Sequence, residues 1–564
     1  MTFGIMLGYA ILLIFLGLFS TRLLKKNSGD YFLASRGIGP FMLLMSIFGT
    51  TMTAFALVGS TGRAFEKGIG VYGLMASWSG IIHSACFFLI GARVWALGKK
   101  HGYMTQLAFF RDRYRSDLLA LLLFPLLVGF VTVYILMGVV GSGRVIQALT
   151  PETFAEREVT TQVIAQNPPA NLTISESWHD RLSFDKATNT LTLTGSIHPK
   201  RRGELFAMAG GPPTPEWKKT VGELINKAPR GAVPYPVGMG FICLVVLIYV
   251  FFGGMRATAW ANTFQTLVFM VMGVVAFLVI TSKLGGPTAA TETLLRSGAA
   301  ERAVRGDQIH KSQFLTYCFI PLSVGMFPHL FQHWLTAKRA SNFKLTVVAH
   351  PICIAITWVP CILLGIWAAA ELPAATDPNS VLGVMVAKHS TELLSGLIGA
   401  GILAAIMSSM DSQFLCLGSL FTNDIVVRYG RHIGLTEIND RTKIRLGRLF
   451  IFAMVTITFL IGLTNPGGVF SIGVWCFTGF ASLFPVVIAA LYWKRANKWG
   501  AIASVVTVAT LWIWFLGDAL GGEFLIAGMM PVTFLLAASA LAMVAGTLLT
   551  PPPPRDLQEK FFPA

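Results

Sequence analysis

Apolar segments recur along nearly the whole chain and are separated mostly by short polar loops. About 20 apolar residues form a helix long enough to cross a hydrocarbon core about 30 Å thick. The strands of a membrane barrel would be about half as long and would alternate in polarity. We therefore predict an all-α polytopic membrane protein with about 13 transmembrane helices, at residues 2–24, 40–60, 72–97, 118–145, 237–252, 260–281, 313–335, 345–370, 394–420, 449–463, 469–493, 501–520 and 524–549.

One region interrupts this pattern. Residues 150–236 are polar and contain several prolines. Within them, residues 181–197 alternate in polarity like two short strands around a turn at residues 187–189. We therefore expect a small extramembrane insertion that contains β structure.

The composition indicates a membrane protein, and the positions of the basic residues explain its positive net charge. Hydrophobic residues make up 54% of the chain and charged residues 13%, whereas soluble proteins carry roughly 25% charged residues. The net charge of +17 could indicate nucleic-acid binding in a soluble protein, but most basic residues lie here in short loops between apolar segments. Cytoplasmic loops are enriched in lysine and arginine. This bias predicts an outer N-terminus and a cytoplasmic C-terminus, and no nucleic-acid partner.

The ninth segment carries polar residues near its middle. Ser408, Ser409, Asp411 and Ser412 follow one another closely in an otherwise apolar helix. Aspartate at the centre of a membrane helix costs at least roughly 2.5–3.5 kcal/mol, so it usually faces a cavity, a partner or an ion path. Together with Ala405, the serines form a stripe of oxygens on one side of the helix, as a hard cation such as sodium requires. Alternatively, the serines hydrogen-bond to their own helix or to a neighbouring one.

Two other segments contain residues that interrupt helices. The second segment contains Gly49 and several threonines, and the seventh contains Gly325 and Pro328 near its middle. An unwound backbone at mid-membrane is tolerated where it lines a cavity or a site. The two segments are five spans apart, which is typical of a transporter built from inverted repeats. A small-residue face that packs on a neighbouring helix would explain Gly49 equally well.

Five motifs occur in the order and spacing of a known family. They are DYFLASRGIGP at 30–40, FFGGMRATAWANTFQ at 251–265, GMFPHLFQHWLTAKR at 325–339, AAIMSSMDSQ at 404–413 and ALYWKRANKWG at 490–500. In these motifs the chain resembles the sodium:solute symporter family. The resemblance implies a LeuT-type fold of five helices plus five inverted helices, sodium-coupled symport of a small solute by alternating access, and no enzymatic activity.

The resemblance also implies boundaries between the parts of the chain and a cellular location for the protein. We expect an integral protein of a bacterial inner (plasma) membrane, and the sequence leaves its oligomeric state open. The predicted parts are the first helix with its basic loop at 1–39, the first repeat at 40–149 and 237–282, the insertion at 150–236, the outer loop with the second repeat at 283–493, and the last helices with a short tail at 494–564.

The resemblance also implies sodium sites, with Na⁺ as the coupling ion. Position by position, the main site of the family corresponds to Gly49, Met52, Ala405, Ser408 and Ser409. Some relatives have a second site with an aspartate where this chain has Asn262. That site is therefore either absent here or has its carboxylate on the opposite helix, at Asp411 beside Ser412. Asp411 could instead cap the inner vestibule, or take a proton, since a desolvated carboxyl has a raised affinity for one.

The solute is less closely defined. Sugar-transporting relatives have a Glu-Gln pair where this chain has Phe55 and Ala56, which disfavours a sugar. Half-helix amides can hold a carboxylate without an arginine, so we favour a carboxylate, an amino acid or a pantothenate-like acid. A proton-coupled symporter and a transporter-like sensor are the alternatives. His329 and His333 lack a nearby third metal ligand. The candidate substrate-binding residues are Thr50, Thr51, Thr53, Phe55, Gly325, Phe327, Trp475 and Phe477.

Overall fold

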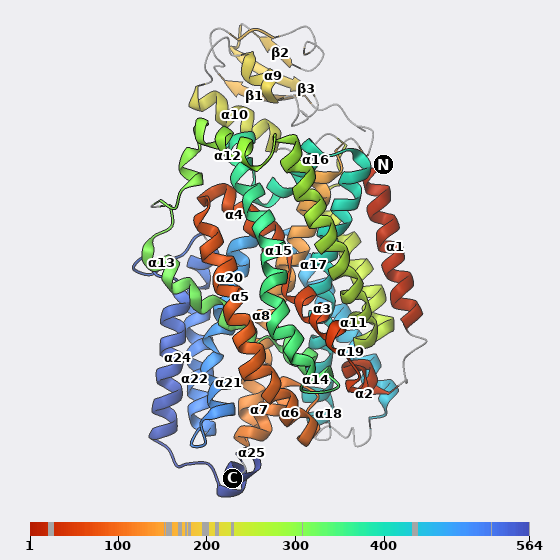
Figure 1. Cartoon of the computed structure of the whole chain (residues 1–564), viewed down its shortest axis with the longest axis vertical. Coiled ribbons are helices and arrows are strands. Elements are labelled where there is room, and N and C mark those ends of the chain that lie inside the picture. The colour runs from red at the N-terminus through yellow and green to blue at the C-terminus, as the bar shows by residue number, and fades with distance from the viewer. Residues whose placement is uncertain are drawn as a thin grey trace.

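The protein is a bundle of long helices with a small β-containing insertion at one end (Figure 1). The computed structural model describes residues 1–20, 27–151, 153, 161–166, 172–174, 178, 182–185, 187–194, 202–208, 214–226, 231–306, 308–430, 438–520 and 522–562. The basic pair Lys25 and Lys26, which supported the predicted orientation, lies outside these residues.

Most helices are joined by short connections, apart from residues 150–201 of the insertion, which separate α8 from α9. In chain order they are α1 (Thr2–Ser20), α2 (Ser28–Leu33), α3 (Pro40–Thr51), α4 (Ser60–Lys67), α5 (Trp78–Cys86), α6 (Ala92–His101), α7 (Gln106–Tyr114), α8 (Asp117–Leu149), α9 (Arg202–Ala207), α10 (Pro215–Asn226), α11 (Tyr235–Lys283), α12 (Pro287–Arg296), α13 (Lys311–Thr316), α14 (Pro328–Thr336), α15 (Asn342–Glu371), α16 (Val381–His389), α17 (Glu392–Leu420), α18 (Val427–Tyr429), α19 (Asp440–Leu463), α20 (Val469–Ser482), α21 (Phe484–Tyr492), α22 (Lys498–Trp514), α23 (Leu516–Leu520), α24 (Pro531–Leu548) and α25 (Arg555–Phe561).

Within the described residues, nine helices are long and apolar enough to span a membrane, or up to eleven if each of two bent pairs counts as one span. One of the nine, α11, folds back on itself at Gly254, whose φ of 55° and ψ of −157° are not helical. Tyr249 and Gln265 are 16 residues apart, yet their side chains approach to 3.5 Å, whereas a straight helix would separate them by about 24 Å. The predicted number of 13 spans stays a prediction, because it also counts the 17-residue α22.

The two predicted helix interruptions are confirmed. The α3 helix and residues Phe55–Lys67 meet at an angle of 58°, and residues Lys311–Gly325 meet α14 at 51°. At the first break Met52 is extended, and the Thr53 hydroxyl accepts a hydrogen bond from the Phe55 N–H at 3.0 Å. At the second break Pro328 begins α14. Proline disfavours helical geometry in the preceding residue, so the helix restarts there.

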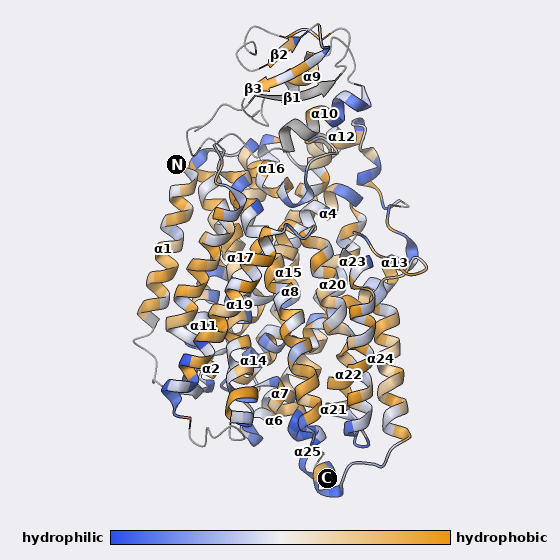
Figure 2. Ribbon diagram, turned by 180° about the vertical axis from the view of Figure 1, so that it is seen from behind, coloured by the Kyte–Doolittle hydropathy of each residue, from blue (hydrophilic) through white to orange (hydrophobic). Residues whose placement is uncertain are grey.

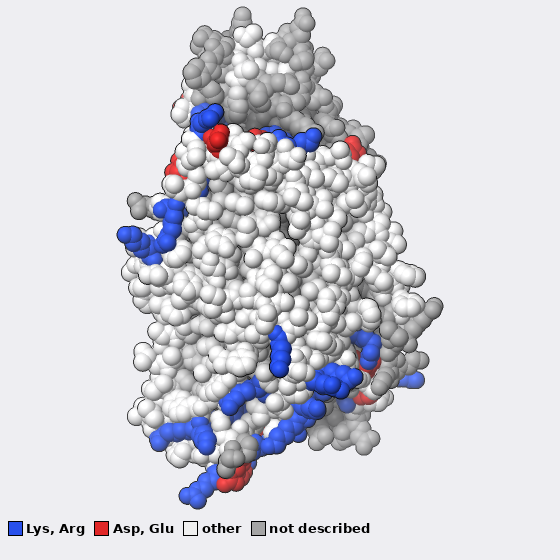
Figure 3. Space-filling model, viewed as in Figure 1, with Lys and Arg blue, Asp and Glu red and all other residues white. Residues whose placement is uncertain are grey.

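The bundle has a central helix and peripheral ones. In the span Glu392–Tyr429, which begins with α17, 83% of an apolar 18-residue window is buried inside the protein, against 28% in α1 and 33% in α24. Hydrophobic residues dominate the middle of the bundle (Figure 2), and Lys, Arg, Asp and Glu gather mainly towards its two ends on the face shown in Figure 3. This distribution fits an integral membrane protein whose apolar flank faces lipid.

The insertion contains a three-stranded antiparallel sheet in the order β1-β3-β2. Its strands are β1 (Thr161–Gln166), β2 (Leu182–Asp185) and β3 (Thr190–Thr194). The predicted hairpin is β2–β3, and its turn is held by the Ala187 N–H, which donates to Asp185 Oδ1 at 2.9 Å. Strand β1 was not predicted. The insertion has its own apolar core, which includes Trp178, Leu191, Leu193, Leu205 and Trp217.

Candidate cation and substrate sites

The break after α3 faces the middle of α17. The Ser408 hydroxyl lies between two carbonyl oxygens, at 2.8 Å from that of Gly49 and 2.9 Å from that of Ala405. Helix ends leave their last carbonyls without partners in the helix, and the early end of α3 thereby frees the Gly49 carbonyl for this contact. The structure therefore brings three of the five predicted ligands of the main sodium site together in a fully buried position.

The other two predicted ligands lie in the same region. Met52 is the first residue beyond α3 and is fully buried. The Ser409 hydroxyl donates to the Ile406 carbonyl of its own helix at 2.9 Å. Ser408 and Ser409 therefore both make the back-bonds that the alternative interpretation expected, and Ser408 in addition bridges to α3.

Gly49 allows α3 to approach its neighbours closely. A Cβ atom on Gly49 would clash with the Thr266 hydroxyl of α11 and would lie 3.6 Å from Ser408 Cβ. The Thr266 hydroxyl in turn donates to the Met45 carbonyl of α3 at 3.0 Å. A larger residue would therefore separate α3 from the oxygens of α17.

We expect Gly49→Ala to abolish sodium-dependent uptake or to raise the sodium concentration it requires. Overpacking of a tight contact costs about 1–3 kcal/mol, and here the displacement falls on a predicted ligand. Gly39→Ala is the matched control, because nothing lies within 4 Å of a Cβ atom at Gly39. Uptake into proteoliposomes at several sodium concentrations measures both variants. Normal sodium dependence in Gly49→Ala would contradict the proposed site.

The second predicted set also comes together. Asp411 accepts hydrogen bonds from the Tyr249 hydroxyl and from the Ser412 hydroxyl, each at 3.1 Å. The Asn262 amide donates to the Ser412 hydroxyl at 2.9 Å. All four side chains are buried. Asn262 of α11 and Asp411 of α17 therefore lie on facing helices, and both contact the Ser412 hydroxyl.

This cluster continues through residues that the sequence analysis missed. His333 Nε2 lies 3.0 Å from the Ser412 hydroxyl, and His333 Nδ1 lies 3.1 Å from the Ser46 hydroxyl of α3. A continuous hydrogen-bonded chain therefore runs from Tyr249 through Asp411, Ser412 and His333 to Ser46. The sequence pattern of His329 and His333, four residues apart, indicates at most a metal ligand and gives no sign of this contact. Among the described residues, no group of three or more His, Cys, Asp or Glu side chains could hold a metal ion.

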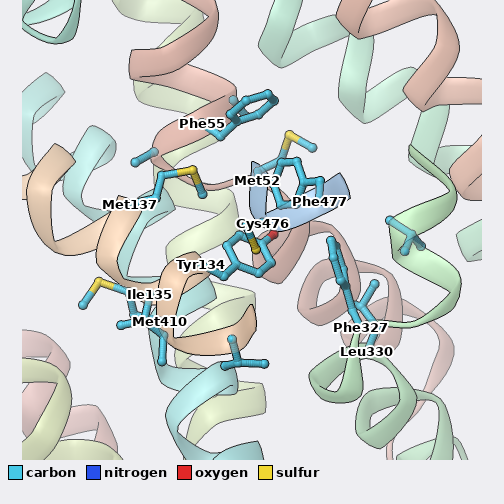
Figure 4. Close-up of a cluster of buried hydrophobic side chains, with 14 of the residues drawn as sticks. Met52, Phe55, Tyr134, Ile135, Met137, Phe327, Leu330, Met410, Cys476 and Phe477 are labelled. Carbon is cyan, nitrogen blue, oxygen red and sulfur yellow. The ribbon is translucent and has the colours of Figure 1, made fainter. Parts of the chain in front are cut away.

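The predicted substrate residues form one aromatic cluster and several outlying positions. Phe55, Phe327 and Phe477 lie together with Met52 and Tyr134 (Figure 4). The ring centroids of Phe55 and Phe477 are 5.0 Å apart, and those of Phe327 and Phe477 are 5.7 Å apart. Tyr134 of α8 contacts both Phe327 and Phe477, at 5.2 and 5.1 Å, and was not predicted.

Three other predicted residues have different surroundings. Trp475 stacks on Trp512 of α22, with ring centroids 5.6 Å apart. A Cβ atom on Gly325 would lie 2.7 Å from Ile90, so this glycine permits close helix packing. The Thr51 hydroxyl donates to the Phe48 carbonyl at 2.9 Å and lies 3.2 Å from His350 Nε2.

The remaining two threonines differ in their hydrogen bonding. The Thr53 hydroxyl accepts a hydrogen bond from the Phe55 N–H, at the start of the second half of the broken helix. The buried Thr50 hydroxyl has no hydrogen-bond partner among the described residues. An unpaired buried hydroxyl beside a helix break is consistent with a site that receives a polar ligand group.

Known proteins resemble the chain over nearly its whole length. The osmoregulated proline transporter OpuE of Bacillus subtilis is 23% identical over 91% of this chain and 89% of its own. The sodium/pantothenate symporter of Escherichia coli is 22% identical over 90% of this chain and 91% of its own. A solved Na⁺-coupled sialic acid symporter in a substrate-bound outward-open state has a TM-score of 0.65 and 16% identity over 98% of both chains.

These comparisons settle the fold and the family. The likeness to the solved symporter confirms the predicted LeuT-type fold. The model of the sodium:solute symporter family matches residues 31–152 and 222–507, which is more than half of the chain and leaves out most of the insertion. The chain therefore belongs to the sodium:solute symporter family.

Proposed function

We propose that this protein is a sodium-coupled symporter that carries a small organic solute across a membrane by alternating access. The observation that carries the proposal is the convergence of the Gly49 and Ala405 carbonyls on the Ser408 hydroxyl, between the broken α3 and the central α17. These oxygens are hard ligands of the kind that sodium prefers. The family and its curated relatives are transporters, and sodium is the coupling ion in the family name.

The geometry explains how ion and solute can depend on each other. A sodium ion held by Gly49, Met52, Ala405, Ser408 and Ser409 would fix the inner half of the broken helix against α17. The outer half begins at the Thr53–Phe55 cap, and Phe55 is part of the aromatic cluster. The proposed sodium site and the proposed solute site therefore share one hinge, which is the break after α3. Binding at one site favours the conformation that the other requires, which is the physical basis of coupling.

A second cation site is proposed at Asp411, Asn262 and Ser412. It is supported by their mutual hydrogen bonds and by the 3.5 Å contact between the Ser412 hydroxyl and the Ser408 carbonyl, which makes the two sites adjacent. Proton coupling is the alternative. It is favoured by the chain from Asp411 through Ser412 and His333 to Ser46, since a neutral imidazole can accept a proton at one ring nitrogen and release the proton bound to the other.

The solute is proposed to be a small carboxylate, an amino acid or a pantothenate-like acid. The cluster of Phe55, Tyr134, Phe327 and Phe477 offers apolar surface and a single phenol. A polyhydroxylated sugar would need more polar partners. The relatives named above include proline and pantothenate transporters, and both compounds carry a carboxylate.

The orientation is proposed to be N-terminus outside and C-terminus cytoplasmic, in a bacterial inner membrane. In Figure 1 the N-terminus lies at the same end as the insertion, and the C-terminus lies at the opposite end. On the face shown in Figure 3, many of the Lys and Arg residues lie towards the C-terminal end. Basic residues collect on the cytoplasmic side.

Uptake into proteoliposomes tests the function directly. The labelled solutes are lactate, pantothenate and L-proline, and a sodium gradient or a proton gradient is imposed separately. We expect accumulation of at least one of these solutes under the sodium gradient alone. Accumulation under the proton gradient alone would establish the alternative. Accumulation of none of them under either gradient would contradict the proposed solute class.

A further inference from the structure

A cavity of about 780 Å³ is lined by residues that do not belong to the aromatic cluster. The cavity borders α4, which lies towards the end of the bundle that carries the insertion (Figure 1). It lies between α4, the end of α8, the start of α20 and the loop before α24, and Phe470 lies on its wall. The Phe470 ring stacks on Phe55, with centroids 5.4 Å apart, so this aromatic pair lies between the cavity and the helix break. Four basic side chains line the cavity, namely Arg63, Lys67, Arg144 and Arg302.

The carboxylates of the same cavity are already engaged. Glu523 pairs with Arg63 and with Lys67, and it accepts a hydrogen bond from the Gln313 amide at 2.6 Å. Burial would raise the pKa of Glu523, but the Arg63 charge, with Gln313 and Lys67, brings that pKa below its ordinary value. Glu523 therefore stays ionised and its oxygens are occupied.

The two other acidic side chains are also paired. Glu66 accepts a hydrogen bond from Arg63 at 3.1 Å. Asp377 lies 3.7 Å from Arg144 Nε and accepts a hydrogen bond from the Asn379 N–H at 3.0 Å. The cavity thus has four basic groups against three acidic ones, and the acidic groups have partners from the protein.

The guanidinium groups, by contrast, retain buried donors without partners. Arg63 Nε and both Nε and Nη1 of Arg302 have no hydrogen-bond partner among the described residues, and Arg144 Nε has only its 3.7 Å ion pair with Asp377. Arg302 has only a 3.5 Å charge contact to the half-exposed Glu301, which does not line the cavity. The Arg302 carbonyl accepts the Ile69 N–H at 2.9 Å, which fixes this residue against the end of α4. The basic side chains that line the cavity therefore offer more hydrogen-bond donors than its acidic side chains can accept.

We propose that this outer cavity binds the carboxylate group of the solute, with Arg302 as its main partner, before the solute passes the Phe470–Phe55 pair. The inference rests on the proposed function and adds a first binding step for the organic anion or zwitterion proposed above. Guanidinium groups bind carboxylates through charge-assisted hydrogen bonds in a fork geometry. A cavity of about 780 Å³ falls within the size range of small-molecule sites.

Binding tests the proposal independently of transport. The unfolding temperature of the detergent-purified protein is measured with potassium lactate, potassium pantothenate, lactamide and potassium chloride at equal concentration. A ligand that binds the native state raises this temperature. We expect a rise with at least one carboxylate, and little with lactamide or chloride. The rise should be lost in Arg302→Gln, partly kept in Arg302→Lys, and unchanged in Arg296→Gln, whose side chain is 82% exposed on α12.

Transport kinetics give a second readout for the solute that accumulates. Loss of a charged hydrogen bond predicts an increase in KM of about tenfold or more for Arg302→Gln, with the maximal rate largely kept because Arg302 lies outside the aromatic pair. Equal shifts by chloride and carboxylates, or an Arg302→Gln variant with unchanged binding and KM, would overturn the outer site. The proposed function is judged separately, by sodium-dependent uptake in the parent protein.

Discussion

Ser408→Ala is expected to abolish sodium-driven accumulation, or to raise the sodium concentration for half-maximal uptake by about tenfold or more. The substitution removes the hydroxyl that joins the Gly49 carbonyl of α3 to the Ala405 carbonyl of α17. Alanine has the highest helix propensity, so α17 itself should persist. The measurement is uptake into proteoliposomes as a function of external sodium, with the amount of inserted protein determined in parallel.

Ser482→Ala is the matched control for this prediction. Ser482 is fully buried in α20, and its hydroxyl donates to the Thr478 carbonyl of its own helix at 2.7 Å. The Ser482→Ala variant therefore shows the effect of losing a buried hydrogen bond from a serine to its own helix, away from the proposed ion site. We expect near-parental sodium dependence. Equal losses in Ser408→Ala and Ser482→Ala would indicate a structural role for both residues and would contradict the sodium site.

Asp411→Asn is expected to reduce the number of sodium ions transported per solute by one. Asparagine can still accept the Tyr249 hydrogen bond, so the packing of α17 should be kept while the negative charge disappears. A neutral carboxamide is a much weaker cation ligand than a carboxylate. The ratio of ²²Na⁺ flux to solute flux measures this effect, and the sodium dependence of uptake should become less steep. An unchanged ratio and unchanged sodium affinity would contradict a second sodium site.

A double variant makes this test specific to the position of the charge. Asn262 and Asp411 both contact the Ser412 hydroxyl from facing helices. Asn262→Asp combined with Asp411→Asn therefore moves the carboxylate across the same site, and we expect it to recover sodium dependence that the single variant loses. Uptake that is driven by protons alone and lost in Asp411→Asn would instead establish proton coupling at Asp411.

The sequence predicted the parts of the site that depend on local geometry. Helix periodicity places Ser408, Ser409 and Ser412 on neighbouring positions of α17, and Gly49 and Pro328 mark breaks that the structure contains. The roles of these residues as ligands came from the family resemblance and stay predictions. The structure shows that Gly49, Ala405 and Ser408 do meet.

The parts that were not predicted involve partners far apart in the chain. His333 and Ser412 are 79 residues apart, and Tyr249 and Asp411 are 162 apart. No local pattern indicates that such residues meet. Likewise, Trp475 and Phe477 lie two residues apart in α20, but Trp475 stacks on α22 while Phe477 joins the cluster with Tyr134. Helix rotation within the bundle decides between these environments.

The sequence by itself determined the class of protein, its helical fold, the two broken helices and the polar stripe on α17. A bilayer imposes these features residue by residue, because each span must be apolar and must satisfy its own backbone, except where it lines a site. The tertiary structure alone decided that Asp411 meets Tyr249, that His333 bridges Ser412 to Ser46, and that three arginines share one outer cavity. Helix tilt and rotation follow from side-chain packing between neighbours, and that packing is a property of the whole bundle.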